Sequence, residues 1–208
     1  MSRTPCHRLH RRPPRALGVA LAAAALLGAC ATTHVDTVGS PAMEPLCQRG
    51  NESLQAMVVW SAHWRADQKE PQLREAAARK GIERFFSESG CFASARVVES
   101  TDRPAPLGRL TPAQVRDMAA PAQRAVFVTV RELGPVLKLL SSLALVDGGT
   151  EVVLDLKVVA THTGETLGDF RTHWQNGGPW VFKGVAGLEE DMVSALRGAM
   201  RPASVNRP

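Results

Sequence analysis

The chain has 208 residues, with 25 Lys and Arg against 20 Asp and Glu, and a formal charge of +5. Five arginines and no acidic residue lie in residues 1–29, so the rest of the chain is neutral overall and a general nucleic-acid-binding function loses its electrostatic basis. Hydrophobic residues make up 44%, too large a share for a disordered protein, and four Trp, six Phe and no Tyr are too few to predict a stacking surface for bases or sugars.

The amino terminus has the layout of a signal peptide. A basic segment, residues 1–15, precedes an apolar run of twelve residues, 16–27. As a helix that run would span about 18 Å, well short of the roughly 30 Å hydrocarbon core of a bilayer. The pattern therefore predicts a signal peptide over 1–29 rather than a permanent membrane helix.

The residues Leu27-Gly28-Ala29-Cys30 that follow resemble the lipobox of bacterial lipoproteins. The resemblance implies cleavage before Cys30, a diacylglycerol on its thiol and an acyl chain such as palmitate on its amine. The alternatives are an ordinary secretory signal cut after Ala29, or an uncleaved anchor. Because the next residue is Ala31 and not Asp, the resemblance also implies sorting to the outer membrane, with the protein lipid-anchored on its periplasmic face.

The rest of the chain divides by composition. Residues 30–50 are rich in Thr, Ser, Pro and Gly without hydrophobic periodicity, which predicts a lipidated tether that reaches at most about 70 Å. Residues 51–202 are expected to form one periplasmic α/β domain, large enough to bury its own core, and 203–208 a disordered tail.

Periodicity within this domain predicts strands and helices in the order β-α-β-α-β-β-β-α. The expected elements are a strand at 54–60, a helix at 71–87, a strand at 95–99, a helix from Pro112 to about Ala119, strands at 125–131, 151–161 and 166–174, and a helix at 185–200. Gly90 should end the first helix and Pro202 the last. The predicted fold class is α+β (or α/β), with one mixed β-sheet and helices packed on one side.

This order resembles the amino-terminal domain of TolB and the periplasmic domain of the curli secretion-channel lipoproteins. The resemblance depends on the strand-helix-Gly-strand unit from Ala56 to Val98 and on the hairpin Val152–Leu167. Within that hairpin, Thr163-Gly164-Glu165 match the family pattern, whereas the position of its aspartate is occupied by Ala160. The resemblance implies a scaffold, pore subunit or activator rather than an enzyme.

A second resemblance points to the auxiliary lipoproteins of ABC-type lipid transporters. It depends on Trp60-Ser61-Ala62-His63-Trp64, on a helix that ends in Phe85-Phe86, and on Gly90-Cys91-Phe92. This resemblance implies binding of a lipid or another apolar ligand, which the face between sheet and helices would hold.

Two cysteines remain after Cys6 leaves with the signal peptide and Cys30 takes the lipid. Cys47 precedes the first predicted strand and Cys91 the second, so parallel pairing of these strands would bring the two thiols to one edge of the sheet. A disulfide is expected in an oxidising compartment, and two buried thiols are the alternative.

No pattern of catalytic residues emerges from the sequence. The chain has no G-x-S-x-G, S-x-x-K, C-x-x-C or H-E-x-x-H motif and no phosphate-binding loop. The four histidines of the mature chain are not spaced as metal ligands, and the glycine pairs at 148–149 and 177–178 are typical of turns. We therefore expect no enzymatic activity, no metal and no cofactor.

Two segments are candidates for a contact surface. Residues 134–146 are strongly apolar, which predicts either an exposed hairpin that meets a sister subunit or membrane, or a buried strand or short core helix. Residues 174–182 place two tryptophans around a glycine-rich loop, which is typical of an interface unless the loop folds back on the domain. The candidate interface residues are Leu140, Leu143, Trp174 and Trp180.

The sequence therefore predicts a non-catalytic outer-membrane lipoprotein. It would assemble with itself, as a homo-oligomer, or with an envelope export or transport complex, and would bind no nucleic acid. The alternative function is that of an auxiliary lipoprotein that binds a lipid for a transporter.

Overall fold

The strand β5 (Leu145–Ala160), which lies near the middle of the sheet, contains the clearest alternation of apolar and polar residues in the sequence. Val152, Leu154 and Leu156 are at most 1% exposed, whereas Asp155 and Lys157 between and beyond them point to the opposite face. Alternate side chains of a strand point to opposite faces, so this strand divides an apolar side of the sheet from a polar one.

The computed structural model describes residues 31–40, 46–47, 53–100, 110–140 and 145–200, apart from the side chains of 138–140 and 145–146. Six strands in this part of the chain form one sheet in the order β1-β6-β5-β4-β2-β3. The other strands are β1 (Thr32–Ser40), β2 (Gln55–Ala62), β3 (Ser94–Glu99), β4 (Arg124–Leu140) and β6 (Thr166–Pro179). The helices are α2 (Pro71–Glu88), α3 (Pro112–Ala119) and α4 (Leu188–Met200), with a 3-10 turn at Val185–Gly187 before α4.

The sheet is mixed. The strands β4, β5, β6 and β1 are antiparallel neighbours, and β2 is parallel to both β3 and β4. Parallel neighbours need a crossover connection, which α2 supplies between β2 and β3. The predicted α+β class and single mixed sheet are confirmed.

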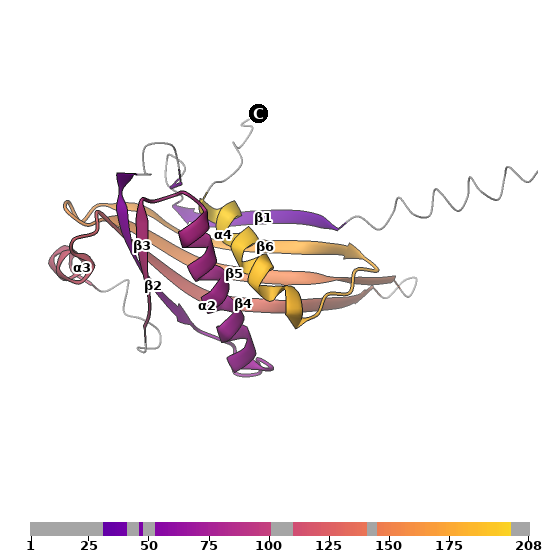
Figure 1. The fold of residues 1–208 in the computed structure, drawn as a ribbon. Helices are drawn as coiled ribbons and strands as arrows, with labels where there is room; N and C mark the ends of the chain where they lie inside the picture. Colours follow the sequence, from indigo (N-terminus) through magenta and orange to yellow (C-terminus); the bar gives the residue numbers. More distant parts are fainter. Residues whose placement is uncertain (1–30, 41–45, 48–52, 101–109, 141–144, 201–208) are drawn as a thin grey trace, which may run out of the picture. The chain divides into compact units, whose positions relative to one another are not determined.

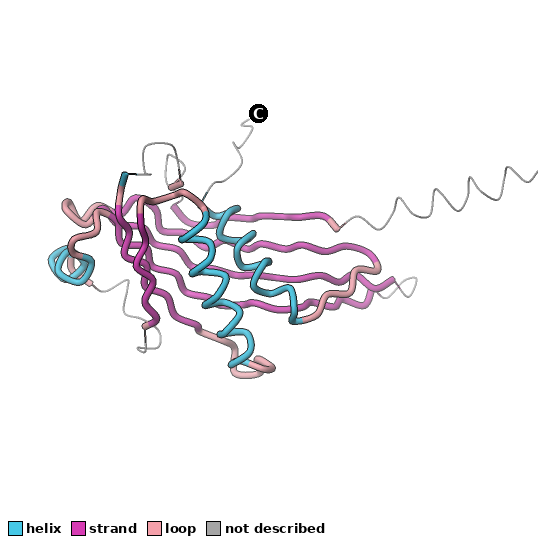
Figure 2. Tube along the Cα trace, viewed as in Figure 1, coloured by secondary structure: helices cyan, strands magenta, loops and turns pink. Residues whose placement is uncertain are grey.

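Two helices, α2 and α4, lie side by side across one face of the sheet (Figures 1 and 2). The predicted apolar face of α2, from Ala78 to Phe86, is buried there, with Phe85 at 2% exposure. The two helices approach closely at Gly81, where a Cβ atom would stand 2.6 Å from the Cβ of Met192 on α4. Glycine is therefore required at this position because a side chain would collide with α4, and not because of its backbone conformation.

The third helix, α3, lies against the other face, so the expectation of helices on one side holds for only two of the three. Val115 and Ala119 of α3 pack against Met57, Val59 and Phe127, which point away from α2 and α4. The reason is local composition: β2 and β4 are apolar on both faces here, so the second face also needs a cover. The predicted start of α3 is confirmed, with the Thr111 side chain accepting from the amide of Gln114.

Part of the expected tether belongs to the sheet. Residues Thr32–Ser40 form β1, which pairs antiparallel with β6 from Thr32 opposite Gly177 to Ser40 opposite Asp169. The prediction of a tether is therefore wrong for these nine residues, because an edge strand needs only the free edge of a partner and no buried face of its own. Residues 41–45 and 48–50, and the predicted segments 1–29 and 203–208, lie outside the described residues; the domain boundaries as a whole stay predictions.

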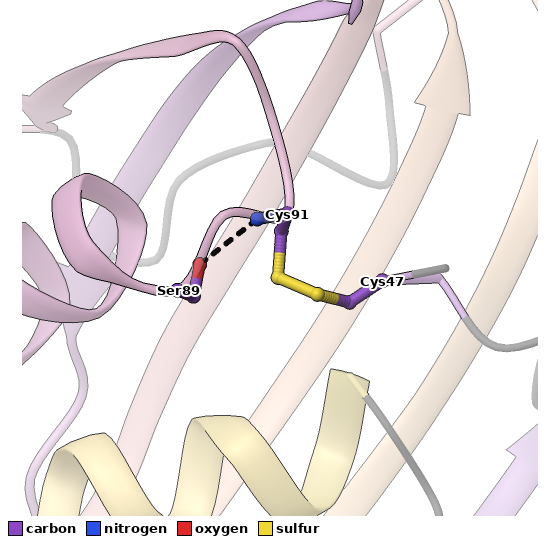
Figure 3. Close-up of a disulfide and its surroundings, with 3 residues drawn as sticks. All are labelled: Cys47, Ser89 and Cys91. Carbon is purple, nitrogen blue, oxygen red and sulfur yellow. Dashed lines mark hydrogen bonds between the residues drawn. A yellow bond between two sulfur atoms is a disulfide. The ribbon is translucent and has the colours of Figure 1, made fainter. Parts of the chain in front are cut away.

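Cys47 and Cys91 form a disulfide, with Cα atoms 4.8 Å apart (Figure 3). The parallel pairing of β2 with β3 brings the two residues together, as expected from their positions before these strands. The amide of Cys91 donates to the Ser89 hydroxyl, and the amide of Cys47 donates to the carbonyl of Met200 at the end of α4. The disulfide thus fastens the segment before β2 to the end of α2, and the hydrogen bond to Met200 joins the same segment to the end of α4.

Replacement of both Cys47 and Cys91 with alanine should lower the free energy of unfolding. The disulfide closes a loop with a sequence separation of 44 residues. Loss of that constraint on the unfolded chain costs at most about 4 kcal/mol. The measurement is urea unfolding with and without reductant; reductant should shift the midpoint of the wild type and leave that of the double variant unchanged. Equal midpoints for oxidised and reduced wild type would contradict the prediction.

Candidate interface and anchor site

Four strands end together where β1 begins. Thr32 of β1 lies opposite Gly177 of β6, Gly177 lies opposite Gly149 of β5, and Gly149 lies opposite Val136 of β4. We call this end of the sheet the anchor end, because the predicted lipidation residue, Cys30, precedes Thr32 by only two positions. Cys30 itself lies outside the described residues.

The two glycine pairs lie within strands at the anchor end, so the prediction of turns there is wrong. Gly148 lies opposite Gly178 and Gly149 opposite Gly177 across β5 and β6. A Cβ atom on Gly149 would stand 2.4 Å from the carbonyl oxygen of Asn176, so no larger residue fits. The bare backbone leaves a shallow hollow of about 310 Å³, bordered by side chains that include His34, Glu151 and Gln175.

Among the side chains that the structure describes at the anchor end, the strongly exposed apolar ones are those of Leu137, Trp180 and Phe182. They are 59%, 57% and 69% exposed, respectively. Leu137 belongs to β4 and lies opposite Gly148, and the two aromatic residues follow the last residue of β6. We refer to these three residues as the apolar tip.

The candidate interface residues have different environments. Trp180 is exposed, as an interface residue should be. Trp174 is only 3% exposed in the core under α4, so its assignment to a contact surface is wrong; it lies on the face of β6 that α4 covers. Leu140 ends β4 opposite Leu145, in agreement with a hairpin over 134–146, but its side chain and all of Leu143 lie outside the described residues.

The face of the sheet opposite α2 and α4 carries a row of paired charges, which we call the charged face. At its centre Asp155 of β5 accepts from Arg131 of β4 at 2.8 Å and from Arg171 of β6 at 2.5 Å. The Arg131 side chain also lies 2.9 Å from His63 Nδ1. One carboxylate therefore joins three neighbouring strands.

Further pairs continue this row on β5 and β6. Lys157 Nζ lies 3.7 Å from the carboxylate of Asp169, and His173 Nε2 lies 2.6 Å from Glu151. The opposite charges of Lys157 and Asp169, which lie directly opposite each other on neighbouring strands, favour one register, although such an exposed pair contributes little to stability. The charged face is thus polar but internally neutralised.

Two carboxyl groups at this face have shifted pKa values in opposite directions. Burial alone would raise the pKa of Asp155, but hydrogen bonds from Arg171 and Arg131 outweigh it and hold the pKa below its ordinary value. Burial raises the pKa of Glu132, and the opposing charge of Arg65 at 2.8 Å only partly offsets that effect. Asp155 is therefore held ionised by its arginine partners.

Neither a metal centre nor a membrane-crossing helix is found within the described ranges. No three His, Cys, Asp or Glu side chains gather there as ligands would. None of the helices in those ranges is both long and apolar enough to cross a bilayer.

Several features of this site escaped the sequence analysis. Phe182 and Leu137 lie in segments that were singled out, but only their exposure distinguishes them from core residues. The alternation of Asp155 and Lys157 placed charges on one face of β5, yet nothing in the sequence paired Asp155 with Arg171. That pair depends on the register between β5 and β6, where the two residues are directly opposite.

No protein-family model matches this chain, and no curated protein matches it in sequence. Several solved structures share part of its arrangement. A PelC dodecamer from Paraburkholderia phytofirmans is similar at 11% identity and a TM-score of 0.41, with 83% of this chain and 100% of that chain covered. The hypothetical protein CT253 from Chlamydia trachomatis is similar at 9% identity and a TM-score of 0.45, with 71% and 98% covered.

The lipoprotein GNA1162 from Neisseria meningitidis is similar at 17% identity and a TM-score of 0.36, with 69% of this chain and 94% of that chain covered. The neighbours thus include a bacterial lipoprotein. At such low identities and TM-scores, these likenesses reveal nothing about what this chain does.

The Asp155 cluster predicts a specific dependence of stability on pH. The pKa of Asp155 is lower in the folded state than in the unfolded state, where it is about 3.9. The contribution of Asp155 to the free energy of unfolding is therefore fully present above the unfolded-state pKa and is lost as the pH falls through the folded-state pKa. Substitution Asp155→Asn removes that contribution at every pH. The difference in urea midpoint between wild type and variant should therefore be largest near neutral pH and narrow below about pH 4.

The matched control is Asp169→Asn, which removes a looser ion pair on the same face. It should change the midpoint only slightly at any pH. A difference between wild type and Asp155→Asn that stays constant from neutral to acidic pH would show that the aspartate is not held ionised by the arginines.

Proposed function

We propose that this chain is a non-catalytic, lipid-anchored protein on the periplasmic face of the outer membrane that serves as an assembly or scaffold component of an envelope export or transport complex. The anchor is Cys30, and the contact surfaces are the outer edge of β1, the charged face and the hairpin of β4 and β5. The sequence supports the anchor, and the shape of the sheet supports assembly.

The observation that carries the proposal is the edge strand β1. All nine residues of Thr32–Ser40 are exposed, and β1 ends the sheet, so its outer edge presents backbone amides and carbonyls to a further strand. Such an edge is a template for pairing with another chain. Val38 is 74% exposed, so an added strand would also cover apolar surface.

The charged face supports the same function. Among the described elements, α3 packs against this face only at the β2 and β4 side, and the charged rows of β5 and β6 are solvent-accessible. Paired charges in fixed positions favour specific protein contacts, since a partner with the wrong pattern meets like charge. The resemblance to scaffold and pore-forming lipoproteins stated above agrees with such a role.

The alternative function requires room for a lipid between the sheet and helices α2 and α4. Within the described residues that layer is occupied by packed side chains, with Trp60, Phe85 and Leu154 at most 2% exposed and Ile82 and Met192 fully buried. A ligand there would have to displace this core. We therefore favour the assembly function.

The anchor is tested with Cys30→Ser in a Gram-negative host. The wild type should be cleaved before Cys30 and carry diacylglycerol and an amide-linked acyl chain, whereas the variant should remain an unacylated precursor, because the thiol is the attachment atom. Mass spectrometry of the amino-terminal peptide measures both. An unmodified wild-type terminus at Cys30 or Ala31 would exclude lipidation.

Assembly is tested with single charged substitutions in the hairpin of β4 and β5. We expect Leu140→Asp or Leu143→Asp to dissolve an assembly of the detergent-purified lipoprotein while the domain stays folded, because a charge placed in a buried contact costs several kcal/mol. Sedimentation measures the mass and circular dichroism the fold.

The control is Leu133→Asp, which places a charge in the core, where Leu133 is fully buried. This variant should unfold, since an unpaired buried charge is not tolerated. If Leu140→Asp and Leu143→Asp unfold as well, the hairpin is core; if both assemble normally, the hairpin is not a contact surface. A wild type that sediments as a single copy would contradict the assembly function itself.

A further inference from the structure

The short link between Cys30 and the sheet limits where a membrane can lie. Cys30 and Thr32 are two residues apart, a distance of at most about 7 Å along the chain. Thr32 lies opposite Gly177, and Trp180 follows Gly177 by three residues. A lipid on Cys30 therefore brings the membrane surface next to the anchor end, with no tether to hold the domain away.

The apolar tip lies at this end. Leu137, Trp180 and Phe182 are all more than half exposed. Trp174, which lies within β6, is instead buried in the core and only 3% exposed. Within residues 174–182, therefore, Trp180 is exposed because it lies beyond the end of β6, whereas Trp174 within β6 is buried.

The backbone holds Trp180 outward. The amide of Val181 donates to the carbonyl of Gly178 at 3.2 Å, which closes a turn, and Trp180 has a φ of 62° within it. That left-handed conformation favours Gly or Asn and is unfavourable for a bulky side chain. The turn is seated on β5, because a Cβ atom on Gly148 would stand 2.2 Å from the carbonyl oxygen of Val181.

We propose that the apolar tip is a second membrane contact, in which Trp180 and Phe182 enter the headgroup region of the same leaflet that holds the acyl chains of Cys30, with Leu137 beside them. The inference rests on the lipid anchor of the proposed function. Tryptophan suits this region because its ring is apolar and its N–H is polar, and a single anchor residue gains from a second attachment point. A lipid surface is favoured over a partner protein because the anchor itself places lipid within reach.

The test uses the lipidated full-length mature protein in vesicles of phosphatidylethanolamine and phosphatidylglycerol, made with and without bromine on the acyl chains. Bromine quenches tryptophan fluorescence only at close range. Brominated vesicles should lower the emission of the wild type, and Trp180→Phe should lose most of that quenching, because its ring no longer contributes to the signal. The matched control is Trp64→Phe, which changes a tryptophan packed against the core and should keep the quenching.

Each outcome decides the proposal. Quenching that is lost in Trp180→Phe and kept in Trp64→Phe supports it. A lipidated, vesicle-bound wild type without quenching, or a Trp180→Phe variant that keeps it, overturns the second contact and leaves the anchor intact. A blue-shifted Trp180 emission without quenching means that a protein surface covers the tip, which also overturns it.

A second variant separates contact from folding. Trp180→Asn keeps the left-handed turn, which asparagine adopts readily, but removes the ring. This variant should unfold at the same urea concentration as Trp180→Phe or at a higher one, because asparagine fits the left-handed turn better, and it should likewise lose the quenching; retention of the quenching would overturn the proposal. If the lipoprotein sediments as a single copy and its tryptophan is still quenched, the second membrane contact is supported. Only the assembly function is then contradicted.

Discussion

The fold depends on the burial of one face of β4, β5 and β6 beneath α2 and α4. Every second side chain of β5 from Val152 to Val158 is at most 2% exposed in this layer. The close approach of the two helices at Gly81 closes it, since any side chain there would collide with Met192. The disulfide joins the segment before β2 to the residues that follow α2, and a backbone hydrogen bond from Cys47 to Met200 joins the same segment to the end of α4.

The polar character of the opposite face results from the same alternation of residues along β5. Because each apolar residue of β5 is followed by one that points away from the core, burial of Leu154 and Leu156 places Asp155 on the other side, where Arg131 and Arg171 meet it from both neighbouring strands. On the side opposite α2 and α4, the helix α3 covers β2 and β4, whereas the charged rows of β5 and β6 and the free edge of β1 are accessible to solvent.

The sequence predicted the elements whose own residues determine them. The alternation of β5, the apolar face of α2 and the Thr111 start of α3 are local patterns, and each was found where expected. The strand β1 was missed because all its side chains are exposed, so only the free edge of β6 makes it a strand. Gly148 and Gly149 were taken for a turn because their strand conformation depends on the glycines opposite them in β6. Pairing between distant segments cannot be read from either segment alone.

The position of β1 also has a consequence for the order of events. Thr32 bonds to Gly177 across a sequence separation of 145 residues, so β1 is made well before β6 and cannot pair until β6 exists. Loop closure over such a distance is slow relative to local helix and hairpin formation. Until β6 has formed, the backbone of β1 has no strand to pair with. Pairing with β6 then occupies one edge of β1 and leaves its other edge free, so the last strand pair to close is also the one that ends the sheet.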